Sequence, residues 1–79
     1  MVSDRIQSVF RETFRDDDLE ITEATTKSDI AGWDSLADVK LIISLEEEFD
    51  IKFTTNEVGH LQGVGDVMAA LARRGIAMH

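Results

Sequence analysis

The segment from Asp34 or Ser35 to about Phe49 limits the possible folds, because its spacing predicts a helix with apolar side chains on two sides. At about 100° per residue, four large side chains form one stripe: Leu41, Ile42, Leu45 and Phe49. A second stripe lies on the opposite side: Leu36, Val39 and Ile43. A chain of 79 residues has too little interior to bury both stripes fully. We therefore expect the first stripe in the core, whereas the second is either exposed for a partner or covered by the long loop or a later helix.

The rest of the chain also favours helices, because proline is absent and β-type alternation is scarce. Apolar residues at helical spacing predict a first helix over residues 3–14: Ile6, Val9, Phe10 and Phe14. We expect a short helix over residues 54–61 and a last helix over residues 64–74. The predicted fold is all-α: a small four-helix bundle with three principal helices, a short third helix, and a long loop between helices one and two. We expect residues 1–79 to form a single domain with residues 76–79 frayed.

Residues 15–34, RDDDLEITEATTKSDIAGWD, show no sustained period and predict that long loop. Four apolar residues are expected to pin it to the core: Leu19, Ile21, Ile30 and Trp33. A loop of about 20 residues is unusual in so small a domain and is often functional. The acids at positions 16, 18 and 20 resemble the start of a calcium loop, but Ile21 and Lys27 stand where that loop needs glycine and a carboxylate. We therefore exclude a calcium site.

The charge is strongly acidic, with sixteen acidic and eight basic residues and a net charge of −8. Such a surface repels nucleic acid and anionic membranes and suits partners with basic faces, although acidity can also serve solubility alone. Cysteine is absent, so the chain has no thiol of its own and no disulfide. No apolar run is long enough to span a membrane. We expect a cytoplasmic protein, monomeric, with neither nucleic-acid binding nor membrane insertion.

The common catalytic constellations are missing. His60 and His79 are the only histidines, and a lone histidine on a short helix is more typical of a surface residue than of a catalytic base. The chain has no cysteine nucleophile, and GVGDV lacks the lysine of a phosphate-binding loop. Glu46, Glu47 and Glu48 are expected on a solvated helix face. We expect neither an independent enzyme nor a metal site.

Ser35, in the stretch GWDSL, has two possible roles. It can cap the helix that follows, as Asp34 can, and SLAD loosely resembles a capping box. It can also be a modification site, because it is expected at an exposed loop–helix junction beside an apolar stripe. A phosphodiester on Ser35 would lie near the positive end of the helix.

The segment DSLADVKLIISLEEEFDIKF, residues 34–53, resembles the central helix of acyl carrier proteins, with a D-S-L motif followed by LEEEF and a short extended link. TTNEVGHLQGVGDVMAAL is similar to the short third helix of that family and the entry into its fourth. The resemblance covers nearly the whole chain.

The resemblance implies that Ser35 accepts 4′-phosphopantetheine from coenzyme A and that Asp34 assists the attachment, by helping to bind magnesium in a separate phosphopantetheinyl transferase. Acyl groups would then ride as thioesters on the thiol of the arm. The later partners would be acyl-loading, condensing and acyl-transfer enzymes with basic docking faces. The implied docking residues lie on the central helix: Leu36, Asp38, Val39, Ile43, Glu46 and Glu47.

Two departures affect the choice of pathway, because Ala37 and Lys40 stand where carriers of fatty-acid synthesis usually have acids. The pathway can therefore be fatty-acid, polyketide or specialised lipid-type synthesis. An aminoacyl or peptidyl carrier is the alternative function. A third possibility is an unmodified helical interaction module in which Ser35 is only a cap.

Overall fold

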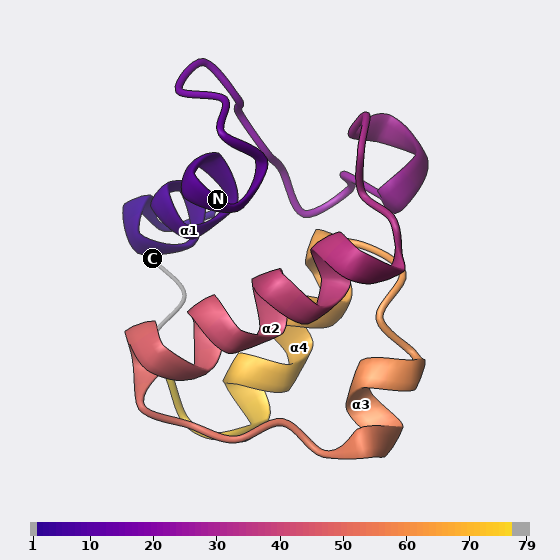
Figure 1. Ribbon diagram of the computed structural model, residues 1–79. Helices are drawn as coiled ribbons and strands as arrows, with labels where there is room; N and C mark the ends of the chain where they lie inside the picture. The colour runs from indigo at the N-terminus through magenta and orange to yellow at the C-terminus, as the bar shows by residue number, and fades with distance from the viewer. Residues whose placement is uncertain (1, 77–79) are drawn as a thin grey trace.

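The computed structural model describes residues 2–76, and within that range it contains four α-helices and one short 3-10 helix. The elements follow in this order: α1 (Asp4–Phe14), the 3-10 helix (Lys27–Asp29), α2 (Ser35–Phe49), α3 (Thr55–Gly59) and α4 (Val64–Arg73). In Figure 1, α2 runs across the middle of the molecule, with α1 on one side and α4 on the other. The all-α prediction is confirmed, with a short third helix and a long connection before α2.

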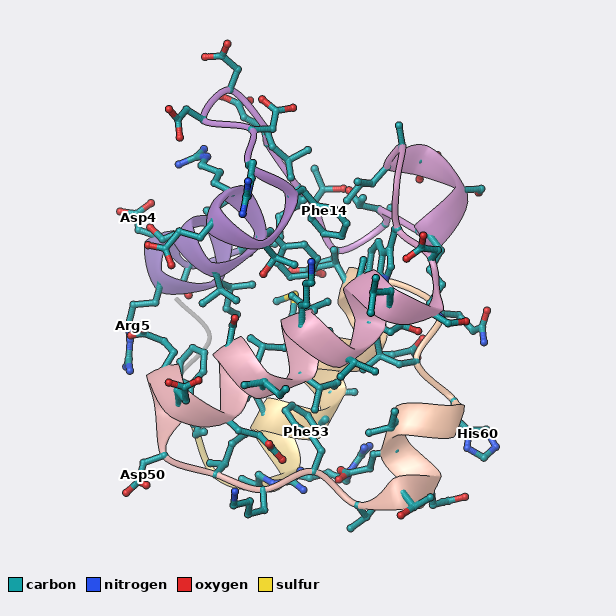
Figure 2. The ribbon with its side chains drawn as sticks, in the orientation of Figure 1. Asp4, Arg5, Phe14, Asp50, Phe53 and His60 are labelled. Atoms are coloured by element: carbon teal, nitrogen blue, oxygen red, sulfur yellow. The ribbon has the colours of Figure 1, made fainter. Side chains whose placement is uncertain are left out.

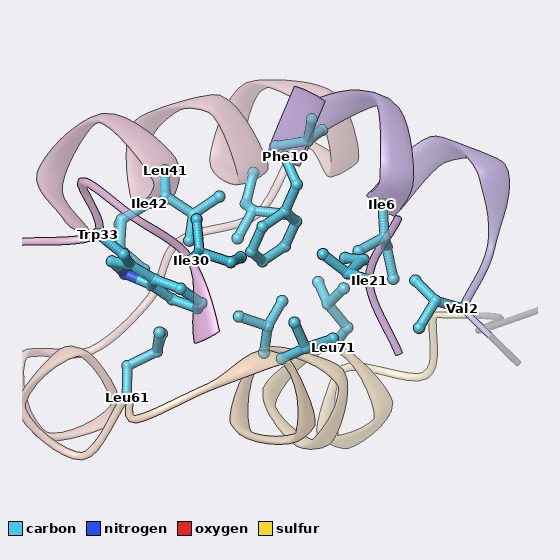
Figure 3. Packing of buried hydrophobic residues seen from close by; sticks show 14 residues of the cluster. Val2, Ile6, Phe10, Ile21, Ile30, Trp33, Leu41, Ile42, Leu61 and Leu71 are labelled. Atoms are coloured by element: carbon cyan, nitrogen blue, oxygen red, sulfur yellow. The ribbon is translucent and has the colours of Figure 1, made fainter. Parts of the chain in front are cut away.

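The core lies between α1, α2 and α4 (Figure 3). The side chains with no exposed surface come from these helices: Ile6, Phe10, Leu41, Leu45, Val64, Val67 and Leu71. The larger apolar stripe of α2 is confirmed as the inward one, although Phe49 at its end is only half-buried. Ile76, the first residue of the segment expected to fray, packs against the core, and its N–H donates to the Leu71 carbonyl at 3.2 Å. The rest of the predicted frayed segment, residues 77–79, lies outside the described residues.

The long loop is held against α1 by side chains that bond to its backbone. The Gln7 amide both donates to the Ile21 carbonyl at 2.9 Å and accepts from the Ile21 N–H at 3.0 Å. Arg11 donates to the Leu19 carbonyl at 2.7 Å. Ile21, Ile30 and Trp33 are buried, as the sequence predicts, so the loop leading to α2 has a fixed path.

A second attachment joins the loop to the junction between α3 and α4, where Thr26 and Gly63 form an isolated antiparallel bridge. The Lys27 N–H donates to the Gln62 carbonyl at 3.0 Å, and the Val64 N–H donates to the Thr25 carbonyl at 2.9 Å. The two backbones are so close that a Cβ at Gly63 would lie 2.6 Å from the Thr25 carbonyl oxygen. Only glycine fits without moving one of the two segments.

Gly63→Ala is therefore expected to destabilise the protein by about 1–3 kcal/mol, the usual cost of forcing extra volume into a packed place. Gly59→Ala is the matched control, because a Cβ there meets no atom within 4 Å and Gly59 is helical. It should be neutral or stabilise by up to about 1 kcal/mol. Urea unfolding followed by circular dichroism measures both, and equal stability of the two variants would contradict the close approach at Gly63.

The short helix α3 is held to the rest of the molecule by Glu57. Its carboxylate accepts from the Thr54 N–H in a capping box at the start of α3. It also accepts from the guanidinium group of Arg74, at 2.5 Å and 2.8 Å, and from that of Arg73, at 3.0 Å. Hydrogen bonds from Arg74 and from the Thr54 N–H hold the pKa of Glu57 well below its usual range. The same pair raises the pKa of Arg74. A helix of five residues is too short to persist without such contacts.

The lowered pKa of Glu57 predicts how the stability of the fold depends on acidic pH. A carboxyl with a depressed folded-state pKa stabilises the fold fully above its ordinary pKa of 4.5, and that contribution is lost as the pH falls below this value. The urea midpoint of the wild type should therefore drop on acidification below about pH 4, and Glu57→Gln should show a smaller drop. Glu48→Gln is the control, because Glu48 pairs with Arg5 at an exposed position, where an ion pair contributes little. An unchanged acid dependence in Glu57→Gln would count against this role of Glu57.

Candidate functional site

Ser35 is exposed at the first position of α2, and the cap of the helix is supplied by the residue before it. Asp34 has extended backbone angles, its Oδ1 accepts from the Ala37 N–H at 2.9 Å, and its carbonyl accepts from the Asp38 N–H at 2.9 Å. Within residues 2–76 the Ser35 hydroxyl has no hydrogen-bond partner. Of the two possible caps, the structure therefore selects Asp34 and leaves the Ser35 oxygen free.

The loose capping box expected in SLAD is wrong. That box needs Ser35 as the cap and Asp38 three residues later, but the cap is one residue earlier, so its third position is Ala37. Asp38 instead turns toward the loop, where it accepts from Lys27 at 2.5 Å and from the indole N–H of Trp33.

This pairing also bears on the docking role expected for Asp38, which stays a prediction. Its side chain is only 15% exposed, and Lys27 offsets its charge. Asp38 therefore fixes the loop beside Ser35 and is not a free acid on the surface. Sequence reasoning missed the pair because Lys27 and Asp38 are eleven residues apart, on elements whose relative placement depends on the loop path.

The other predicted docking residues differ in their solvent exposure and in whether their side chains have partners within the protein. Leu36, Val39 and Ile43 are 65%, 53% and 49% exposed, so the second stripe is uncovered, as one of the two alternatives predicts. Glu47 is exposed. Glu46 is half-buried, and its carboxylate accepts from the Phe53 N–H at 2.9 Å, so it helps to anchor the link after α2.

No cluster of three or more acidic, histidine or cysteine side chains that could hold a metal occurs among residues 2–76. His60 lies on the outer side of α3 and points away from the bundle (Figure 2), with its Nδ1 2.7 Å from the Asn56 carbonyl oxygen. Over the same residues, no helix combines the length and the apolar character needed to cross a membrane.

No family model matches the chain, but its individual relatives are proteins of one family. The chain is 34% identical over 73 residues to an acyl carrier protein of Phenylobacterium zucineum, covering 92% of each, and 37% identical over 68 residues to one of Clostridium acetobutylicum, covering 86% and 88%.

The fold agrees with this likeness. The solution structure of the holo acyl carrier protein of Geobacter metallireducens superposes with a TM-score of 0.77 at 39% identity, over 96% of this chain and 92% of that one. By sequence and by fold, this chain belongs to the acyl carrier protein family, whose members are carriers of acyl groups and not enzymes.

Proposed function

We propose that Ser35 carries a 4′-phosphopantetheine arm and that this chain delivers acyl groups on that arm to partner enzymes. The observation that supports this most directly is the exposed, unbonded hydroxyl of Ser35 at the first position of α2. Because Asp34 caps the helix, esterification of the Ser35 oxygen removes no hydrogen bond that the fold uses.

The surroundings of Ser35 fit a phosphodiester. The first N–H groups of an α-helix have no partners within the helix and carry partial positive charge, and the Ser35 oxygen lies beside them. When bound, the arm supplies a terminal thiol, which this cysteine-free chain lacks, and holds the acyl group as a thioester.

Asp34 is proposed to assist the attachment. Its Oδ1 is used by the cap, whereas its other carboxylate oxygen has no partner within residues 2–76 and can help to bind magnesium in the complex with the transferase. In the attachment itself, the Ser35 oxygen bonds to phosphorus of coenzyme A, the bond between the two phosphates breaks, and the nucleotide part of coenzyme A leaves.

The proposed partners are a phosphopantetheinyl transferase and then acyl-loading, condensing and acyl-transfer enzymes of fatty-acid, polyketide or specialised lipid-type synthesis. They would meet the exposed stripe of Leu36, Val39 and Ile43 together with Glu47. We propose that the chain acts as a monomer in the cytoplasm, where coenzyme A is available. The names of the relatives support an acyl carrier over an aminoacyl or peptidyl carrier.

The test is intact mass spectrometry of the wild-type chain after incubation with coenzyme A, magnesium and a phosphopantetheinyl transferase. We expect a gain of one phosphopantetheinyl group, and peptide fragmentation should place it on Ser35. An unmodified chain, or an arm mapped to another serine, would overturn the proposal.

A further inference from the structure

The cations of this acidic chain fall into two groups. Of its eight lysines and arginines, five donate a side-chain hydrogen bond to a protein acceptor: Arg5, Arg11, Lys27, Arg73 and Arg74. Within the described residues the other three, Arg15, Lys40 and Lys52, have no side-chain partner. The structure therefore uses most of its positive charge internally and leaves three side chains open to solvent or a partner.

Two of these three free cations line the same grooves between α1 and α2. Arg15 and Lys40 both line two adjoining grooves between the end of α1 and the first turns of α2, of about 290 Å³ and 340 Å³. Asp34 and Leu36 line the first groove, and Ile43 lines the second. Arg15 follows the last residue of α1 and has a left-handed backbone, φ 51°, and its N–H donates to carbonyls of the last turn of the helix. Phe14, just before it, lies above the start of α2 in Figure 2.

Lys40 also belongs to the exposed face of α2. It lies four residues after Leu36 and three before Ile43, so its side chain neighbours both on the helix surface. Glu47 lies seven residues further on, about 10 Å along the axis, on nearly the same side. The apolar stripe is therefore flanked by positive charge at Lys40 and followed by negative charge at Glu47.

We propose that Arg15 and Lys40 select partner enzymes whose docking face places an acidic side chain at the groove between α1 and α2, and that they disfavour partners whose face is uniformly basic. The inference rests on the proposed carrier function and names the charge pattern of its partners. A cation of this chain and a basic residue of the partner repel each other during encounter, whereas the same cation and a carboxylate of the partner attract each other. These charges therefore change the association rate and the choice of partner.

The experiment compares three chains as substrates of a phosphopantetheinyl transferase with a basic docking face. Lys40→Glu should raise kcat/KM for attachment about three- to tenfold at low salt, and the gain should shrink at high salt. Lys52→Glu is the matched control, because it makes the same change in net charge at an exposed lysine in the link after α2. It should leave kcat/KM nearly unchanged. Arg15→Glu should change the rate in the same direction as Lys40→Glu.

A charge swap tests the other half of the proposal. A transferase variant with glutamate in place of one basic docking residue should prefer the wild-type chain over Lys40→Glu. The inference would be overturned if Lys40→Glu and Lys52→Glu had equal kcat/KM for attachment, or if both transferases had the same preference between the wild-type chain and Lys40→Glu. In either case the arm would still attach to Ser35. Failure of the wild type to accept the arm would instead overturn the carrier function, so the two failures are distinguishable.

Discussion

Replacing Ser35 with alanine is expected to abolish attachment of the arm and to leave the fold intact. The loss should be complete, because the Ser35 oxygen is the atom proposed to bond to phosphorus and no neighbouring residue offers a hydroxyl at that place. The fold should survive because Asp34, and not Ser35, accepts from the Ala37 N–H. Alanine also has the highest helix propensity, so the first turn of α2 loses nothing in Ser35→Ala. Intact mass after incubation with the transferase measures attachment, and the urea midpoint measures stability.

Ser28→Ala is the matched control for this variant. Ser28 is another exposed serine of the loop region, and its hydroxyl lies 2.9 Å from that of Thr26, within the 3-10 helix and its cap. This variant should accept the arm at the wild-type rate. An arm that still attaches to Ser35→Ala, or one lost in Ser28→Ala, would show that the modified residue is not Ser35.

The second large effect is expected at Trp33, which is 6% exposed and sits where the loop, α1 and α2 meet (Figure 3). Its ring packs edge-on against Phe10, with centroids 5.5 Å apart, and against Phe14 at 5.7 Å. Its N–H donates to Asp38. Trp33→Ala removes these contacts and leaves a cavity, at a cost of about 3–5 kcal/mol. A small domain has about 5–15 kcal/mol in all, so the variant should be marginally folded.

Trp33→Phe separates the two contributions of the indole. A phenyl ring can keep part of the packing on Phe10 but cannot donate to Asp38, so we expect it to recover more than half of the loss. Urea unfolding followed by far-ultraviolet circular dichroism compares the three chains. A cost of less than about 1 kcal/mol for Trp33→Ala would contradict the role of Trp33 as the anchor of the loop.

Local pattern predicts most of the helices and both stripes of α2, because helical period and burial act within a few residues of the chain. The spacing of Leu41 and Leu45 is enough to place them inward, and the excess of apolar surface is enough to leave Leu36 exposed. Contacts between distant segments are not encoded in this way. The choice of Asp34 over Ser35 as the cap and the bond from Lys27 to Asp38 both depend on the exact path of the loop.

The two free cations at the groove between α1 and α2 show the same limit on prediction from sequence. Lys40 stands out in the sequence as a departure from the family pattern, but nothing in its position indicates that Arg15 lies across the groove from it. Arg15 is brought there because α1 ends in a left-handed residue and because α1 packs against α2. The position of Arg15 at the same grooves as Lys40 follows from the tertiary structure alone.

The bridge between Thr26 and Gly63 has a consequence for the order of events in the cell. It joins residues 37 positions apart, and Trp33 packs near Leu61 on the same side (Figure 3). The segment that leads into Ser35 therefore reaches its final path only after the chain through Gly63 has been synthesised, because the bridge needs both of its residues and closing a loop of this span follows the formation of local helices. The position of the serine is thus set in part by residues that follow it in the chain.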